Sequence, residues 1–156
     1  MQLDVRSARN EEHALAWPLY RAYIEKNIYP TCSTELSREE WCAEEQSRFS
    51  ERWNPQDFYI VEIDGTCIGW AEIKNSNNSI FFNNLFIQEE WIKKGVAERI
   101  FSEMTPVWKA QKRVVQVPIA ENEDAMSGAI NHLESLDFSH GVYDGISRTM
   151  IADWTK

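Results

Sequence analysis

The chain has 156 residues, 43% of them hydrophobic, and a formal net charge of -9 at pH 7. A chain of this size can bury roughly 70% of its unfolded surface in one core, so we expect a single domain over residues 1–156. The acidic balance argues against nucleic-acid binding, because phosphate contacts need a broad basic surface. No apolar run approaches the ~20 residues of a membrane helix, and the N-terminus is charged where a signal peptide would be apolar. We therefore expect a cytoplasmic protein with no membrane partner.

The three cysteines, Cys32, Cys42 and Cys67, are odd in number and show no C-x-x-C spacing. This pattern argues against a disulfide framework and against a structural zinc site. We expect free, buried thiols and no bound metal.

The first part of the chain predicts a strand and a helix. Residues 3–8 alternate weakly between apolar and polar, as in a strand. Asn10-Glu11-Glu12 resembles a helix cap with acidic residues suited to the positive helix end. Apolar residues then recur at helical spacing as far as Ile24, and Pro30 closes the segment.

A second helix begins at a capping box. Ser37 is the predicted N-cap and Glu40 the third helical residue, and the helix is expected to run to about Arg52. Its exposed side is heavily acidic.

The next section predicts a three-stranded meander. Residues 58–63 and 66–73 flank Asp64-Gly65, a pair that favours a type I′ hairpin turn. A polar connection then leads to a third strand over residues 80–87.

An amphipathic helix follows from Val96, but Pro106 would cost ~3 kcal/mol inside a regular helix. We therefore expect a kink there, or a restart with Thr105 as the cap. Residues 113–117 read as a buried strand that ends before Pro118.

The last part of the chain predicts one helix and a closing pair of strands. Residues 123–136 carry apolar residues on one helical face, and residues 138–142 and 146–152 have strand character. The order of elements predicts an α/β (α+β) fold with a mixed, mostly antiparallel sheet.

Residues 85–101 are the most informative segment. Leu85-Phe86-Ile87 ends an apolar strand, and Ile92-Lys93-Lys94-Gly95-Val96-Ala97 leads into the amphipathic helix. A strand followed by a glycine turn leaves the first backbone N–H groups of the helix unpaired, where they can hold phosphate oxygens. Lys93, Lys94 and Arg99 add positive charge to this predicted anion site.

This segment resembles the acetyl-CoA-binding segment of the Gcn5-related N-acetyltransferase (GNAT) superfamily. In that family a strand leads to Q/R-x-x-G-x-G/A at a helix start; here Gly95 and Ala97 match, and Ile92 replaces the polar residue. The order of elements is also that of the family, so the resemblance covers nearly the whole chain. It implies the acyl-CoA N-acyltransferase fold, with about six to seven strands and about four helices.

The resemblance further implies acetyl transfer from acetyl-CoA, as co-substrate, to a primary amine by direct attack in a ternary complex. The residues expected to bind acetyl-CoA are Leu85, Phe86, Ile87, Ile92, Lys93, Lys94, Gly95, Val96, Ala97 and Asn122. Asn122 follows Val115-Gln116-Val117 and matches a family asparagine that contacts the pantetheine arm.

The chain departs from the family at two catalytic positions. The tyrosine that donates a proton to the departing thiolate in many relatives is Leu133 here, and the glutamate base is Asn84, which can orient a water but cannot take up a proton at neutral pH. Glu72 is an alternative base and Tyr143 an alternative donor. His132 and Ser135 are weaker candidates.

Two other interpretations remain open. Proximity and strand amides could support the reaction without a protein acid or base. Alternatively, the protein is a non-catalytic module that binds acyl-CoA or a partner protein on the same fold.

The acceptor is expected to be a small cationic amine, such as a polyamine or an aminoglycoside. Acidic and aromatic residues in the segment 20–53 would suit a cation, namely Tyr23, Tyr29, Glu35, Glu39, Glu40, Trp41, Glu44 and Glu45. The same residues also describe a solvated amphipathic helix that packs its aromatic side chains inward. A protein amine is the alternative acceptor, and the resemblance is compatible with a homodimer.

Overall fold

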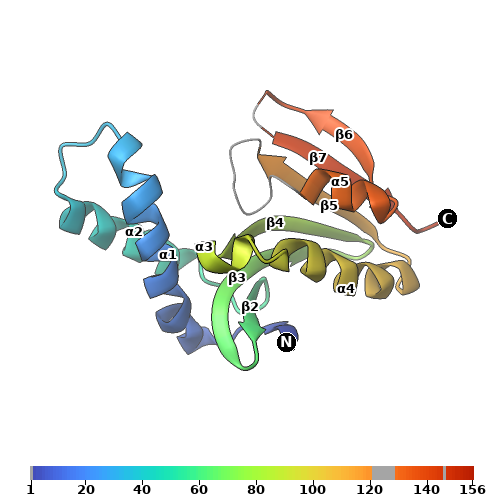
Figure 1. The fold of residues 1–156 in the computed structure, drawn as a ribbon, viewed down its shortest axis with the longest axis horizontal. Coiled ribbons are helices and arrows are strands. Elements are labelled where there is room, and N and C mark those ends of the chain that lie inside the picture. Colours follow the sequence, from blue (N-terminus) through green and yellow to red (C-terminus); the bar gives the residue numbers. More distant parts are fainter. Residues whose placement is uncertain (1, 121–128, 146) are drawn as a thin grey trace. The chain divides into compact units, whose positions relative to one another are not determined.

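The structure is a computed structural model and describes residues 2–120, 129–145 and 147–156 (Figure 1). Seven strands form one sheet in the order β1-β2-β3-β4-β5-β7-β6. They are β1 (Leu3–Ser7), β2 (Phe58–Ile63), β3 (Thr66–Asn75), β4 (Ser79–Ile87), β5 (Val114–Ala120), β6 (Ser139–Tyr143) and β7 (Ser147–Asp153). The pair β4–β5 is parallel, and the pairs β1–β2, β5–β7 and β6–β7 are antiparallel. The predicted mixed, mostly antiparallel sheet is confirmed.

The helices in the described part of the chain agree with most of the sequence patterns. They are α1 (His13–Asn27), α2 (Arg38–Arg52), α3 (Glu89–Ile92), α4 (Val96–Ala110) and α5 (Ala129–Ser135), with two 3-10 turns, η1 (Asn10–Glu12) and η2 (Tyr29–Thr31). The short α3 was not predicted. None of these helices is both long enough and apolar enough to cross a membrane.

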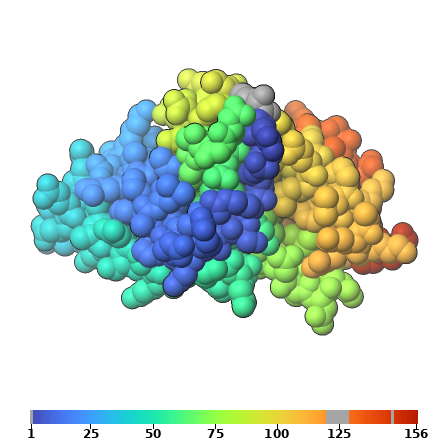
Figure 2. Space-filling model, turned by 90° about the horizontal axis from the view of Figure 1, so that it is seen from below, coloured from blue at the N-terminus to red at the C-terminus, as the bar shows by residue number. Residues whose placement is uncertain are grey.

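The chain divides into two compact units, residues 1–70 and 71–156, and β3 runs through the boundary. The first unit contains β1 and β2, paired from Leu3–Ile63 to Ser7–Tyr59, and the helices α1 and α2. Figure 2 shows the atoms of α1 and α2 side by side, in blue and cyan. The capping box is confirmed, because the Ser37 side chain accepts from Glu40 N at 3.2 Å.

Aromatic side chains make the core of the first unit. The ring centroids of Trp53 and Phe58 lie 4.6 Å apart, and those of Trp17 and Phe49 lie 5.6 Å apart. Trp70 joins the group at 5.5 Å from Phe58. Each of these five residues is buried. Large rings packed at these distances contribute burial energy and about 0.5–1.5 kcal/mol per pair beyond it.

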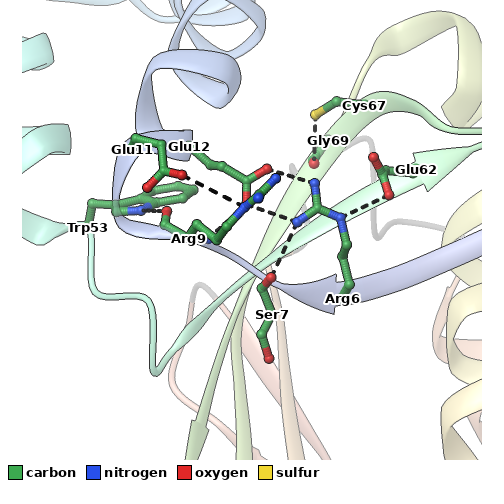
Figure 3. A network of polar contacts seen from close by, with 9 residues as sticks. All are labelled: Arg6, Ser7, Arg9, Glu11, Glu12, Trp53, Glu62, Cys67 and Gly69. Atoms are coloured by element: carbon green, nitrogen blue, oxygen red, sulfur yellow. Dashed lines mark hydrogen bonds and ion pairs between the residues drawn. The ribbon is translucent and has the colours of Figure 1, made fainter.

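A polar network ties the beginning of the chain to this core (Figure 3). The Arg6 guanidinium donates to both carboxylate oxygens of Glu12, at 2.9 and 2.6 Å, and to Glu62 at 3.0 Å. Glu12 also accepts from Arg9 N at 2.8 Å. Hydrogen bonding from Arg6 is the main reason that the pKa of Glu12 falls to about 2. The network therefore fixes η1 against β1 and β2.

The second unit packs α4 against β4 through aromatic contacts. Phe82 on β4 lies 5.1 Å from Phe101 and 6.3 Å from Trp108, measured between ring centroids. The predicted restart at Thr105 does not occur, since α4 continues through Pro106 to Ala110. The buried face of α4 outweighs the loss of one helical hydrogen bond at proline.

Strand β5 corrects a second expectation. It does not end before Pro118 but continues to Ala120, with Pro118 in register with Thr149 of β7. The register with β4 stops at Phe81–Gln116, so Pro118 lies where one edge of β5 has no strand partner. Proline is tolerated on such an edge, because its missing N–H breaks no ladder hydrogen bond.

The thiols are free, as expected, but not all are buried. Cys42 is buried, Cys67 is half-buried, and Cys32 is exposed on the polar segment before α2, which corrects the expectation of three buried thiols. Burial raises the pKa of the Cys42 and Cys67 thiols, which disfavours their reactive thiolate forms.

Candidate active site

Strands β4 and β5 separate in the second unit. Their parallel register covers only Ser79–Val114, Ile80–Val115 and Phe81–Gln116, although β4 continues to Ile87 and β5 to Ala120. Figure 1 shows the two strands diverging toward their carboxyl ends. Backbone N–H and C=O groups on the facing edges of these ends have no partner in a β4–β5 ladder. Such groups need other hydrogen-bonding partners, so the separation is a place where an extended ligand can bind.

The second feature is the start of α4. Gly95 is the N-cap in the left-handed conformation (φ 72, ψ 28), and no side chain caps the helix. The first intrahelical bond runs from Arg99 N to Gly95 O at 3.1 Å, and Gly95 N donates to Ile92 O at 3.2 Å. The N–H groups of residues 96–98 are therefore left without a helical acceptor. Together with the helix dipole, these N–H groups favour an anion at this end of α4.

The third feature is a buried carboxylate on β3. Glu72 is 4% exposed, and its Oε1 accepts from Asn83 Nδ2 at 2.6 Å and from Asn84 Nδ2 at 3.3 Å. Neighbouring strand residues normally point to opposite faces, yet both amides reach one oxygen. Burial along β4 alternates up to Asn83 and then breaks, because Asn83 and Asn84 are both half-buried. The regular alternation of side chains along β4 is therefore interrupted after Asn83, beside the buried carboxylate.

Known structures resemble the chain over nearly its whole length. The PaiA N-acetyltransferase from Thermoplasma acidophilum, solved with coenzyme A, matches with a TM-score of 0.67 and 18% identity, over 98% of this chain and 99% of that chain. YncA from Salmonella typhimurium, solved with acetyl-CoA, matches with a TM-score of 0.55 and 15% identity, over 97% of this chain and 94% of that chain. The ribosomal-protein-S18-alanine N-acetyltransferase from Escherichia coli matches with a TM-score of 0.55 and 12% identity, over 96% of this chain and 91% of that chain.

The chain has the GNAT fold. No protein-family sequence model and no curated protein sequence matches it. The likeness is therefore one of architecture, which the element order and the Gly95–Ala97 turn were sufficient to predict.

Most residues expected to hold acetyl-CoA lie along the path from β4 to α4. Leu85, Phe86 and Ile87 are buried at the end of β4, beyond the last residue in register with β5. Ile92 ends α3 and is half-buried. Val96 and Ala97 are buried in the first turn of α4. Asn122 lies outside the described residues.

The two lysines before Gly95 are exposed, but they differ in their contacts. Lys94 Nζ lies 4.3 Å from the centroid of the Trp91 ring, a cation–π contact that holds the ammonium at the α3–α4 turn. Lys93 is exposed at the C-cap of α3. Arg99, expected to add charge to the anion site, pairs with Glu103 at 3.3 Å along α4.

The position of the GNAT tyrosine faces the core in this protein. Leu133 is fully buried in α5. Of its neighbours, His132 places Nε2 2.8 Å from Ser102 Oγ, and Ser135 Oγ donates to the His132 carbonyl. These contacts join α4 to α5 and cap the last turn of α5, which are structural tasks.

Tyr143, the alternative proton donor, is the last residue of β6 and is 42% exposed. Its hydroxyl donates to Gly145 O at 3.2 Å, and the Arg148 guanidinium lies 5.2 Å from its ring centroid. The ring is thus held at the β6–β7 turn, with its role as a proton donor still a prediction.

Several of the residues expected to attract a cation have structural partners in the first unit. Glu40 completes the capping box of α2, and Glu45 pairs with Arg48. Trp41 is buried, with its ring centroid 5.3 Å from that of Tyr29. These contacts match the interpretation of α2 as an amphipathic helix that packs its aromatic side chains inward.

Sequence reasoning missed Asn83, which makes the shorter hydrogen bond to Glu72. A signal for it was present. An antiparallel pair that begins at the Ser76 N–Ser79 O hydrogen bond, 2.9 Å long, places Glu72 opposite Asn83. The polar connection between the strands could therefore have predicted this register.

Proposed function

We propose that the protein is an N-acetyltransferase that moves an acetyl group from acetyl-CoA to a primary amine. The observation that carries the proposal is the combination of separated β4 and β5 ends with an uncapped α4 N-terminus, on a GNAT fold. Two of the structural neighbours were solved with coenzyme A or acetyl-CoA.

The residues along this path fit the chemistry of acetyl-CoA. The diphosphate would accept hydrogen bonds from the N–H groups of residues 96–98, with Lys93 and Lys94 nearby as positive charges. The pantetheine arm carries two amides and is extended, so the edge of β4 beyond its register with β5 suits it as a neighbouring strand would. When bound, acetyl-CoA supplies a thioester whose C–S bond breaks as the C–N bond to the amine forms.

Glu72 is the proposed general base. An alkylammonium ion with a pKa near ~10 must lose a proton before its nitrogen can attack, and Glu72 is the only acidic residue on β3 or β4. The amides of Asn83 and Asn84 hold the carboxylate in one orientation. Asn84 can also orient a water between the amine and Glu72, through its remaining amide groups. Tyr143 is the proposed donor to the departing thiolate.

A small cationic amine is the proposed acceptor. The net charge of -9 favours a cationic substrate over an anionic one. Glu35, which precedes α2, and Glu39, in its first turn, are exposed and add to this charge. One structural neighbour is named for acetylation of an alanine on a ribosomal protein, so protein N-termini belong in the same test.

The test is an acetylation assay in which thiol release is followed with a panel of polyamines, aminoglycosides and peptides. Glu72→Gln should lower kcat by about 10²–10⁴-fold if Glu72 is the base, and its residual rate should rise with pH as more free amine becomes available. Glu90→Gln, which removes an exposed carboxylate in α3, is the charge control and should retain the wild-type rate. Wild-type protein that binds acetyl-CoA but transfers no acetyl group to any amine would favour the non-catalytic module instead.

A further inference from the structure

Glu98 places an acidic group at the end of α4 where the proposed function requires an anion to bind. It is the third residue of the helix, directly after Val96 and Ala97. A Cβ added at Gly95 would lie only 3.7 Å from Glu98 Oε2, so the carboxylate folds back toward the N-cap. Its Oε2 is buried and has no hydrogen-bond partner among the described residues.

A buried carboxylate oxygen without a donor is costly, so a compensating interaction is expected nearby. The helix N-terminus supplies one, because the three unpaired N–H groups and the helix dipole give this end of α4 a positive potential. Two of the neighbouring cations have other partners. Arg99 Nε pairs with Glu103 at 3.3 Å, and Lys94 Nζ lies over the Trp91 ring at 4.3 Å. Glu98 is thus the internal counter-charge of α4 in the ligand-free protein.

We propose that Glu98 competes with the diphosphate of CoA for the N-terminus of α4, and so sets the affinity of the site. The inference rests on the proposed function. A bound diphosphate would meet a like charge at close range, and the carboxylate would have to turn away before the phosphate oxygens reach the N–H groups. The competition weakens the binding of every ligand that carries the diphosphate, and it leaves the interaction of the pantetheine arm with β4 unchanged. Glu98 is therefore a residue that distinguishes these two parts of the ligand.

The experiment is calorimetric titration of the wild-type protein, Glu98→Gln and Glu98→Ala with acetyl-CoA and, separately, with pantetheine, which lacks the diphosphate. Removing the charge should lower the Kd for acetyl-CoA about tenfold in both variants, because the interaction of a charge with a helix N-terminus and its repulsion of a second anion together change affinity by about this factor. Pantetheine binding should change less than twofold. Glu90→Gln removes the same charge from an exposed site in α3 and should change the acetyl-CoA Kd less than threefold.

A second measurement tests the α4 N-terminus with an anion that has no pantetheine arm. Inorganic pyrophosphate should raise the Tm of Glu98→Gln more than that of the wild-type protein, since no carboxylate repels the anion at the start of α4 in the variant. Wild-type protein that binds acetyl-CoA while both Glu98 variants bind it equally or more weakly would overturn the role of Glu98 alone. Failure of all the proteins to bind acetyl-CoA would overturn the proposed function together with this inference.

Discussion

The carboxylate of Glu12 should make the stability of the protein depend on pH in the acidic range. In the folded protein the pKa of Glu12 is lowered from 4.5 to about 2, chiefly by the hydrogen bonds from Arg6. At 1.36 kcal/mol per pKa unit, this difference corresponds to about 3 kcal/mol. The value is an upper limit, because the Arg6 side chain is 35% exposed and solvent screens the pair.

The sign follows from the direction of the pKa change. The folded state favours ionised Glu12, so the contribution is complete well above pH 4.5 and is lost as the pH falls toward about 2. The same relation leaves about 1.4 kcal/mol at pH 3. Glu12→Gln should therefore cost at most about 3 kcal/mol at pH 7 and about half as much at pH 3 as at pH 7.

Urea denaturation of both proteins at pH 7 and pH 3 measures this difference. Glu11→Gln is the matched control, because Glu11 is the neighbouring residue, its side chain is 73% exposed, and its contact with Arg9 is 3.8 Å long. That substitution should change the free energy of unfolding by less than about 0.5 kcal/mol at either pH. Equal losses in the two variants, or a Glu12→Gln loss that is the same at pH 7 and pH 3, would refute the reasoning.

Three further substitutions test the site and its surroundings. Gly95→Glu should abolish acetyl-CoA binding. The control, Gly65→Glu, has a similar positive φ of +82 in the hairpin turn, so it should share only the left-handed backbone penalty of roughly 1–2 kcal/mol. Titration of both variants with acetyl-CoA compares their affinities, and equal affinities would exclude the α4 site. Gly141→Ala should lower the free energy of unfolding by about 1–3 kcal/mol, because the added Cβ would lie 2.8 Å from the backbone oxygen of Thr149, which cannot move aside as a side chain can. An unchanged denaturation midpoint would contradict the close approach. Leu133→Tyr should lower the free energy of unfolding by about 1–3 kcal/mol without raising turnover, because Leu133 is fully buried. A faster enzyme would mean that a proton donor at this position can reach the site.

The fold could be predicted from the sequence because its local signals agree with one another. The Ser37 capping box, the Asp64-Gly65 turn and the amphipathic pattern of α4 each depend on contacts within a few residues, and all three are present in the structure. The predicted helix restart at Pro106 and the predicted strand end before Pro118 were wrong for the opposite reason. Each proline carries a local penalty that tertiary context removes, through the buried face of α4 in one case and the missing β4 partner in the other.

The candidate site was only partly predictable. The G-x-A turn at Gly95 predicted the start of α4 that we propose binds the diphosphate, because its chemistry depends on backbone conformation and sequence order. The contact of Asn84 with Glu72 could not be predicted, because it depends on the irregularity after Asn83 in β4, which is not local. The direction of Glu98 is also invisible in the sequence, where a glutamate in the first turn of a helix is an ordinary stabilising residue.

The central claim is that the end of β4 and the start of α4 bind acetyl-CoA. A thermal-shift titration of the wild-type protein with acetyl-CoA, and with ATP in parallel, tests it most directly. At a ligand concentration of 100 times Kd, the folded state should gain about 2.7 kcal/mol, which raises the Tm of a chain of this length by about 5–10 °C. The proposal predicts saturable stabilisation by acetyl-CoA that exceeds stabilisation by ATP, since only acetyl-CoA carries the arm that pairs with β4. No shift at millimolar acetyl-CoA would contradict it.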